Sequence, residues 1–285
     1  MRIEKLLFQI NNLLPPETSI KGDRIGLQIQ NDRTELRRIL TTLEITGDVL
    51  DEAHKLQIDT IVTFHPLIYH PLTEITSNDR ISSLTKRIIR EDINVISVHT
   101  NFDAFINGTS YLLAEKLGLV NLDFLEQSDL KENSGMGCVG DTETALFQDE
   151  LLEKVSLICS SPLRYNEIPY EKKINKIAIV GGSGSSFIQE AIVSGADAFI
   201  TADVSYHNFH SVNGKIMLID PGHYEMEQFV PAAMAELLRK NLDLSDIESI
   251  GVSSQLTNPV RYFPDKNFYL QKQKEIINNT YQGDL

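Results

Sequence analysis

Apolar and polar positions follow the same order of short apolar runs and helix-like periods in two parts of the chain. Within residues 36–63, the apolar runs RRILTTLEI and DTIVTF enclose TGDVLDEAHKLQI, whose apolar residues recur with helical spacing. Within residues 174–202, NKIAIVGG and ADAFITAD enclose SGSSFIQEAIVSG. Each part predicts a β-α-β unit, and the apolar runs INVISVHT and GKIMLID that follow predict one more strand after each unit.

Identical residues recur between the two units at a constant separation of 138 positions: Glu52-Ala53, Asp59 and Thr63 match Glu190-Ala191, Asp197 and Thr201. Unrelated β-α-β units can resemble one another by chance, but an unbroken register favours an internal duplication. We therefore expect an α/β fold of two similar lobes, each with a largely parallel sheet. The lobes are predicted to span residues 1–125 and 126–264, interlinked enough to count as one domain, with a C-terminal tail at 265–285.

The rest of the pattern predicts three further helices and one long connection. Residues 1–16, 77–92 and 226–240 carry apolar residues at helical spacing and predict amphipathic helices. Residues 121–137 are mostly polar. We expect them to form a loop that joins the two lobes.

The composition indicates a soluble globular protein, with 41% hydrophobic and 23% charged residues in a chain of 285. No apolar stretch has the length of a transmembrane helix, and the charged first segment lacks the cleavage site of a signal peptide. Cys138 and Cys159 form no CxxC pattern, which argues against a disulfide scaffold or a cysteine-ligated zinc site and favours the cytoplasm. The net charge of −14 disfavours nonspecific binding of nucleic acid.

Most of the histidines follow the carboxyl end of a predicted strand. Five of the seven in the chain do so: His65, His99, His207, His210 and His223. Because open α/β folds bind ligands at the carboxyl edge of their parallel strands, these imidazoles are candidates for a functional site. His65 stands between Phe64 and Pro66, and the proline ends the strand because it has no N–H to donate.

Two histidines have a carboxylate four residues later, His99 with Asp103 and His223 with Glu227. On a helix, residues at this spacing share a face, so that an imidazole and a carboxylate can reach one ion. A single such pair is most often a solvated ion pair. Two pairs and a His-Pro step after strands of duplicated lobes favour a metal site, and nitrogen and oxygen donors suit zinc, iron or manganese.

The stretch GGSGSSF at residues 181–187 lies between a predicted strand and a predicted helix. It has neither the lysine of a P-loop nor the G-x-G-x-x-G spacing of a dinucleotide site. A tight turn between strand and helix is therefore the simpler interpretation.

Five stretches in this order resemble a known family: GDRIGLQI, TFHPLIYHPL, SVHTNFDAF, GGSGSSFIQEAIVSGADAFITADVSYHNF and DPGHYEMEQF. The chain resembles the GTP cyclohydrolase 1 type 2 homologues from about residue 1 to residue 264. The resemblance implies two similar α/β lobes, a pair of metal ions in the cleft between them, and a homohexamer.

The resemblance implies four metal ligands in this chain: His65, Asp103, His223 and Glu227, the last of which bridges two ions. It also places His99 and His207 near the metals, where as catalytic residues they would contact water or substrate. The family usually has His-His-Pro where this chain has Phe64-His65-Pro66. Because a phenylalanine ring cannot bind a metal, the resemblance implies one or two divalent ions per chain.

Two functions follow from the resemblance. The first is a metal-dependent hydrolase that uses metal-activated water on a nucleotide-like substrate, as the family name implies. The alternative is a non-catalytic metal-binding hexamer that acts as a scaffold or regulatory protein.

Overall fold

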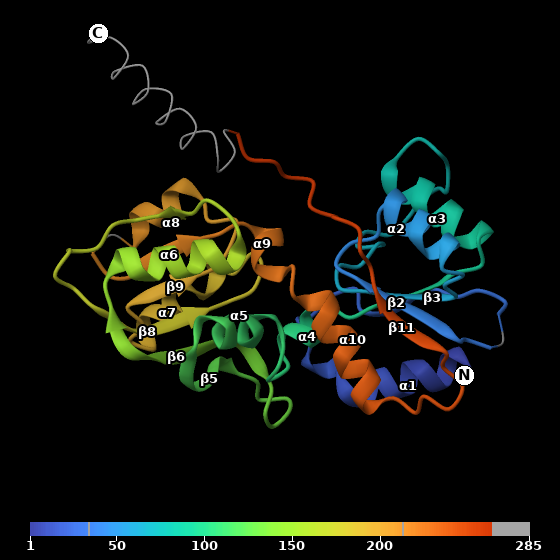
Figure 1. The fold of residues 1–285 in the computed structure, drawn as a ribbon, viewed down its shortest axis with the longest axis horizontal. Coiled ribbons are helices and arrows are strands. Elements are labelled where there is room, and N and C mark those ends of the chain that lie inside the picture. Colours follow the sequence, from blue (N-terminus) through green and yellow to red (C-terminus); the bar gives the residue numbers. More distant parts are fainter. Residues whose placement is uncertain (34, 213, 264–285) are drawn as a thin grey trace, which may run out of the picture.

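The computed structural model describes residues 1–33, 35–212 and 214–263, which form a mixed α/β fold with two sheets (Figure 1). In spatial order, the first sheet consists of β1 (Gly26–Ile29), β4 (Asn94–Ser97), β3 (Thr60–Thr63), β2 (Arg38–Thr42) and β11 (Ser249–Val252). The second sheet consists of β5 (Leu119–Gln127), β6 (Gly135–Leu146), β8 (Ile174–Ile179), β9 (Ala198–Ile200), β10 (Met217–Asp220) and β7 (Arg164–Tyr165).

Each sheet has a parallel centre with antiparallel strands outside it. In the first sheet β11, β2, β3 and β4 run parallel and β1 pairs antiparallel with β4. In the second sheet β8, β9 and β10 run parallel, whereas β5, β6 and β7 pair antiparallel. The predicted β-α-β units are confirmed, because α2 (Gly47–Lys55) connects β2 to β3 and α7 (Ile188–Val193) lies between β8 and β9.

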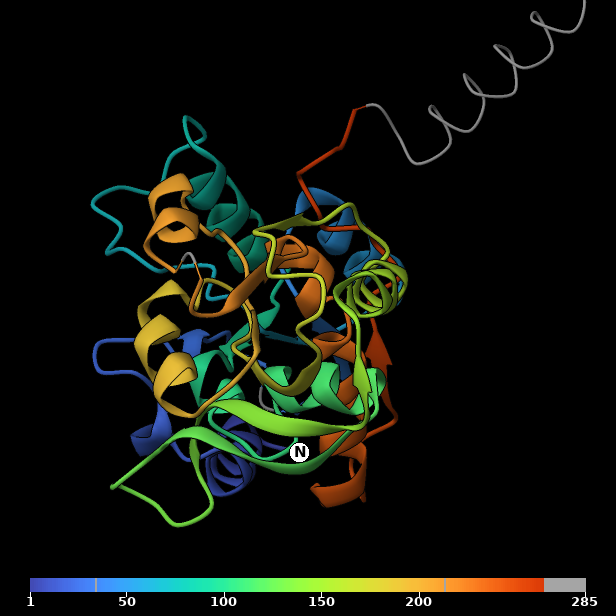
Figure 2. The ribbon, with the colours of Figure 1, turned by 90° about the vertical axis from the view of Figure 1, so that its left-hand side faces the viewer.

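Helices cover the sheets (Figures 1 and 2). The remaining helices are α1 (Ile3–Leu13), α3 (Arg80–Arg90), α4 (Thr100–Asp103), α5 (Thr109–Leu117), α6 (Gln148–Cys159), α8 (Tyr206–Ser211), α9 (His223–Glu227) and α10 (Val230–Asn241), with short 3-10 turns at Pro16–Thr18 and Ser185–Phe187. The helices predicted within residues 1–16, 77–92 and 226–240 are confirmed. Among the described residues, no helix has the length and apolar character needed to span a bilayer.

Both faces of the first sheet are buried, as is usual for parallel strands covered by helices. Along β2, Ile39 belongs to one apolar core and Leu40 to the core on the opposite face. Along β3, Val62 and Ile61 divide in the same way. Each such side chain contributes about 1.5–3 kcal/mol when fully buried, which holds the loops at the strand ends on a rigid support.

One hydrogen-bond pattern occurs in both sheets at the separation of 138 residues. Asp59 Oδ2 accepts hydrogen bonds from the backbone N–H groups of residues 37–38 at 2.7 and 2.9 Å. Asp197 Oδ2 accepts them from residues 175–176 at 3.0 and 3.2 Å. The matching aspartates therefore tie the start of one parallel strand to the start of its neighbour in both sheets.

Sheet membership departs from the lobe boundaries predicted at residues 1–125 and 126–264. The strand β5 already belongs to the second sheet, and β11 returns to the first sheet, where it pairs with β2. The helix α10 packs beside α1 in the core of the first sheet (Figure 1). The apolar residues Met234, Ala235 and Leu238 of α10 explain this return, because they complete that core. The predicted tail at 265–285 lies outside the described residues.

The prediction of a loop at residues 121–137 is wrong. These residues belong largely to the antiparallel strands β5 and β6, the long green ribbons across the lower part of Figure 2. Many of the side chains in β5 are exposed. A strand with one exposed face alternates polar residues with apolar ones, which gives it the composition of a loop.

Candidate metal centre

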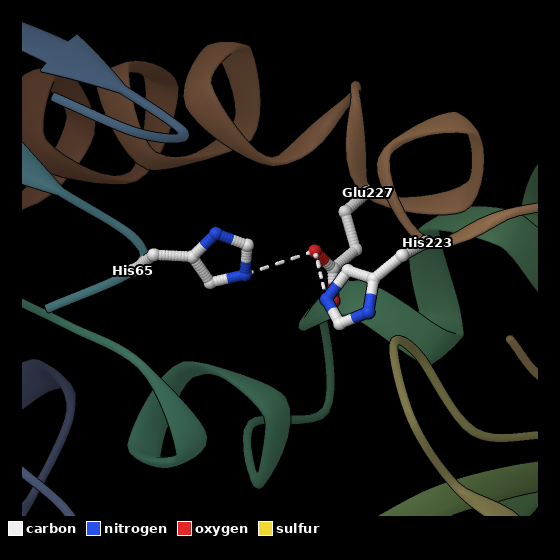
Figure 3. Close-up of side chains that lie close together, drawn as sticks. All are labelled: His65, His223 and Glu227. Atoms are coloured by element: carbon white, nitrogen blue, oxygen red, sulfur yellow. Dashed lines mark ion pairs between the residues drawn. The ribbon is translucent and has the colours of Figure 1, made fainter. Parts of the chain in front are cut away.

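Three side chains from different parts of the chain meet between the two sheets (Figure 3). His65 lies in the loop that follows β3 of the first sheet, while His223 and Glu227 are the first and last residues of α9, after β10 of the second sheet. One ligand atom from each lies within 4.8 Å of the others. The ends of parallel strands in two sheets therefore bring two imidazoles and one carboxylate together.

The backbone around α9 is shaped for this approach. Gly222 precedes the helix with a φ of +95°, a left-handed conformation that favours glycine. Gly182, in the loop after β8, has a φ of +63°, and a Cβ atom there would lie 2.6 Å from Glu227 Oε1. The glycine-rich stretch at 181–187 thus lets backbone pass close to the cluster, which agrees with a tight turn.

Glu227 lies at the centre of the cluster. Its Oε2 atom is 3.1 Å from His65 Nε2 and 3.2 Å from His223 Nε2 (Figure 3). Burial alone would raise the pKa of Glu227, but the two imidazoles lower this pKa to about 2. The carboxylate is therefore ionised throughout the physiological range.

Both imidazoles are held in their protonated form by neighbouring carboxylates. Burial alone would lower the pKa of His65, but Glu227 and Glu44 raise it to about 10. Burial likewise opposes the charge on His223, but Glu227 and Asp203 raise the pKa of His223 to about 9. Without a metal ion, the cluster is thus an ionised carboxylate between two imidazolium groups.

A carboxylate lies behind each imidazole, on the ring nitrogen that faces away from Glu227. Glu44 Oε2 is 3.0 Å from His65 Nδ1, and Asp203 Oδ2 is 2.7 Å from His223 Nδ1. Such partners fix the orientation and tautomer of a metal-binding imidazole and leave Nε2 for the ion. The sequence analysis assigned no role to either carboxylate, although each follows the end of a strand.

Asp103 and His99 lie next to the cluster without joining it. The ring of His99 is 5.7 Å from that of His65, and its Nδ1 contacts Asp23 at 2.9 Å. Burial and the negative charge of Glu227 raise the pKa of Asp103 to about 7. Its Oδ1 atom is buried and accepts no hydrogen bond from the described residues.

His207, the other predicted catalytic residue, lies elsewhere. Its side chain is exposed on α8, where its ring contacts that of Tyr206 at 5.6 Å. Within the described residues, the converging side chains are His65, His223 and Glu227, and His207 is not among them. The structure therefore brings together three of the four predicted ligands, places Asp103 and His99 beside them, and leaves His207 on the surface.

A cavity of about 810 Å³ opens beside His65 and His223. Its walls include Arg80 from the side of the first sheet, Arg164 from the second sheet, and the segment at 257–262. This volume lies within the range of pockets that bind small organic molecules. The candidate ligands therefore border a space large enough for a substrate.

The donor set fits a divalent transition ion. Two imidazoles and one carboxylate match the protein ligands of catalytic zinc sites and of non-haem iron sites. Glu227 Oε2 is buried and ion-paired with both imidazoles, but among the described residues it makes no hydrogen bond of normal geometry. A cation between the three side chains would take the place of the two imidazolium protons.

Comparison with known proteins identifies the family of this chain. A family model described as Duf34/NIF3 (NGG1p interacting factor 3) matches residues 1–259. The chain belongs to the Duf34/NIF3 family. The resemblance seen in the sequence is thereby confirmed, since relatives of this chain carry the name GTP cyclohydrolase 1 type 2 homolog.

Two of these relatives come from bacteria. The protein of Lactococcus lactis subsp. lactis (strain IL1403) is 31% identical over 264 residues, which cover 91% of this chain and 98% of the relative. The protein of Clostridium perfringens (strain 13 / Type A) is 31% identical over 271 residues, covering 92% and 100%. The similarity thus extends over almost the full length of both relatives.

A solved structure shares the fold. The crystal structure of a Bacillus cereus protein related to NIF3 superposes with a TM-score of 0.85 and 21% sequence identity, covering 92% of this chain and 99% of that one. At this identity, the comparison supports the two-sheet architecture.

Proposed function

We propose that this member of the Duf34/NIF3 family binds a divalent transition ion through His65, His223 and Glu227 and acts as a metal-dependent hydrolase on a nucleotide-like substrate. The observation that carries the proposal is the convergence of these three side chains within 4.8 Å beside a cavity of about 810 Å³. The names of the relatives, GTP cyclohydrolase 1 type 2 homolog, support the substrate class.

A divalent ion held there would lower the pKa of a water molecule toward about 7 and so supply a nucleophile near neutral pH. The chain's own residues prepare for this chemistry. Glu44 and Asp203 orient the two imidazoles through their Nδ1 atoms. His99, with its ring next to His65, is the imidazole placed to accept a proton.

Two guanidinium groups support an anionic substrate. The side chains of Arg80 and Arg164 are 51% and 62% exposed and line the same cavity from different sheets. Arg80 contacts Glu44 at 3.0 Å and Arg164 contacts Asp220. Because a guanidinium has five N–H donors, each retains donors for a phosphate group.

We infer that one ion binds tightly and a second weakly or not at all. Phe64 occupies the family's usual ligand position and is fully buried in an apolar core. Asp103, the other ligand that the resemblance implies, has an unpartnered Oδ1 atom but lies outside the converging group. The donors His65, His223 and Glu227 fit one ion, whereas the donors for a second ion are incomplete.

The alternative is a non-catalytic metal-binding protein with a scaffold or regulatory role. The incomplete second donor set around Phe64 and Asp103 favours this alternative, because a site that needs two ions would not assemble here. Turnover separates the two functions. Metal binding alone is compatible with either.

Three further properties are part of the proposal. The homohexamer rests on the family resemblance alone, and native mass spectrometry of the purified protein tests it. An internal duplication is supported by the matching bonds of Asp59 and Asp197. The cytoplasm is supported by Cys138 and Cys159, which are buried and unpaired.

The decisive experiment is a turnover screen with protein loaded with zinc, iron or manganese. Nucleotides are supplied one at a time, and both formate release and phosphate release are measured. The hydrolase predicts metal-dependent release from at least one nucleotide, which His223→Ala abolishes. If no nucleotide is turned over while metal remains bound, the non-catalytic alternative replaces the hydrolase.

A further inference from the structure

A buried carboxylate outside the metal cluster holds the imidazole nearest to it. The side chain of Asp23, which precedes β1, is 4% exposed. Its two oxygens lie 2.9 and 3.0 Å from His99 Nδ1. Asp23 Oδ2 also accepts hydrogen bonds from Thr100, from the backbone N–H at 3.1 Å and from Oγ1 at 2.5 Å. This carboxylate is therefore fixed from two sides.

The pair of Asp23 and His99 repeats the arrangement of the two candidate ligands. His65 has Glu44 on Nδ1, and His223 has Asp203 on Nδ1. In both, Nε2 points to Glu227 Oε2. Because Asp23 occupies Nδ1 of His99, its Nε2 is likewise the nitrogen left for another partner.

His99 differs from the candidate ligands His65 and His223 in the contacts of its Nε2 atom. The converging ligand atoms are those of His65, His223 and Glu227, and within the described residues no hydrogen bond is made by His99 Nε2. The ring nevertheless lies beside that of the candidate ligand His65, at 5.7 Å, and 5.4 Å from the ring of Phe64. An oriented imidazole beside a candidate ligand, with one nitrogen unused, suits proton transfer.

We propose that Asp23 is a positioning residue that holds His99 in the Nδ1–H tautomer, so that His99 Nε2 accepts a proton from a water molecule beside His65. In this step an O–H bond of the water breaks and an N–H bond forms at Nε2. The Asp23 carboxylate stabilises the resulting imidazolium and does not itself take the proton. This inference rests on the proposed hydrolase function, because hydrolysis is the reaction that needs the acceptor.

A purely structural role for Asp23 makes a different prediction. Its bonds to Thr100 join the segment before β1 to the start of α4, and this joining alone would explain its burial. Thr100→Val removes a hydroxyl from the same contact but leaves the carboxylate and the imidazole in place. Asp23→Asn keeps the side-chain shape but replaces the carboxylate by an amide, which can donate as well as accept and no longer enforces one tautomer.

The test measures the tautomer directly. Full-length protein labelled with ¹⁵N at histidine is examined by long-range ¹H–¹⁵N NMR, with the His99 signals assigned from His99→Gln. The parent and Thr100→Val are expected to show neutral His99 protonated at Nδ1, and Asp23→Asn to lose this preference. A parent protonated at Nε2, or an equal change in Thr100→Val and Asp23→Asn, would overturn the proposal. If Asp23→Asn does not fold, the tautomer of His99 in the parent spectrum decides the proposal on its own.

Zinc binding distinguishes positioning from ligation. Glu44→Gln and Asp203→Asn disturb the imidazoles of the cluster and should weaken zinc binding by about 10–100-fold. Asp23→Asn should bind zinc as the parent does, and kcat for any nucleotide found in the screen should fall by about 10²-fold or more with KM unchanged. If Asp23→Asn loses zinc equally, His99 is a ligand and the positioning role is refuted. If the parent binds no zinc, the proposed function fails, while the NMR spectra still decide the tautomer.

Discussion

The ring of Phe64 packs against the ring of His99 at a centroid distance of 5.4 Å and an interplanar angle of 71°. The same ring lies 5.1 Å from His65 and 6.2 Å from Phe102. Phe64 is fully buried, so the position next to a candidate ligand belongs to the apolar core of the first sheet. The position at which the family resemblance implies a second histidine is therefore filled by a packed phenylalanine ring.

Phe64→His should therefore raise the number of ions bound per chain. The new imidazole would give the His-His-Pro sequence that the resemblance implies, and Asp103 Oδ1, which lacks a hydrogen-bond partner among the described residues, offers a further donor. Without metal, the variant should lose about 1–3 kcal/mol of unfolding free energy, because a polar ring replaces a buried apolar one. Titration with zinc against a chelator measures the first effect, and urea unfolding of the metal-free protein measures the second.

Phe64→Leu is the matched control, because it removes the ring without adding a donor. It should bind as many ions as the parent. Should the parent already bind two ions with equal affinity, the idea that Phe64 weakens the second site is refuted, and His99 becomes the first candidate for the missing ligand.

His223→Ala and Glu227→Ala should each lower metal affinity by at least about tenfold while the protein stays folded. Each removes one of the three donors that converge within the described residues. His207→Ala is the control, since that imidazole is exposed on α8 outside the group. Elemental analysis after gel filtration, together with circular dichroism, gives the result. Equal metal in all three variants would show that the ion binds elsewhere.

Local pattern predicted only part of the cluster. His65 and the pair His223 and Glu227 were candidates because each follows the end of a parallel strand, β3 in the first sheet and β10 in the second, and the family resemblance implied that they act together as ligands. The i and i+4 spacing of His223 and Glu227 then needed only one turn of helix to bring the two side chains together. Local pattern was enough for this pair, whereas the meeting of His65 from the first sheet with α9 from the second was implied only by the resemblance.

The partners of the imidazoles could not be predicted in this way. Glu44 and His65 are 21 residues apart, and Asp23 and His99 are 76 apart. Such pairs depend on how strands are ordered in the sheet, which spacing does not show. Spacing also does not show that β11 returns to the first sheet, where α10 completes the core. Nor does it show that His207 is exposed although it follows a strand.

Gly182→Ala should disturb the metal site from outside the ligand set. Its Cβ would lie 2.6 Å from Glu227 Oε1, and the φ of +63° is strained for alanine. We expect a loss of about 1–2 kcal/mol in unfolding free energy from the backbone strain and a weaker affinity for zinc from the displaced carboxylate. Calorimetric titration with zinc and urea unfolding measure the two effects.

Gly195→Ala is a close control for this variant. Gly195 has a φ of +76° but no atom within 4 Å of the added Cβ, so it carries the backbone strain without the contact. It should lose stability to a similar extent and bind zinc normally. If the two variants bind zinc equally well, Gly182 has no part in placing Glu227.

The metal-free protein should lose stability as the pH rises above about 6.5. The folded state raises the pKa of His65 to about 10 and that of His223 to about 9, both above the ordinary histidine value of 6.5. A raised pKa means that the folded state binds protons more tightly than the unfolded state. The resulting stabilisation is complete below pH 6.5 and is lost progressively as the pH approaches 9 to 10.

Metal should reverse this trend, because a metal ion binds neutral imidazoles and competes with the protons. The affinity for zinc should therefore rise with pH over the range in which the metal-free protein weakens. Urea unfolding between pH 5.5 and 9.5, with and without zinc, measures both curves, and His223→Gln should flatten both. A metal-free protein whose stability is constant or increases between pH 6.5 and 9 would contradict the ion cluster around Glu227, since the imidazolium partners of that carboxylate would then contribute nothing to the fold.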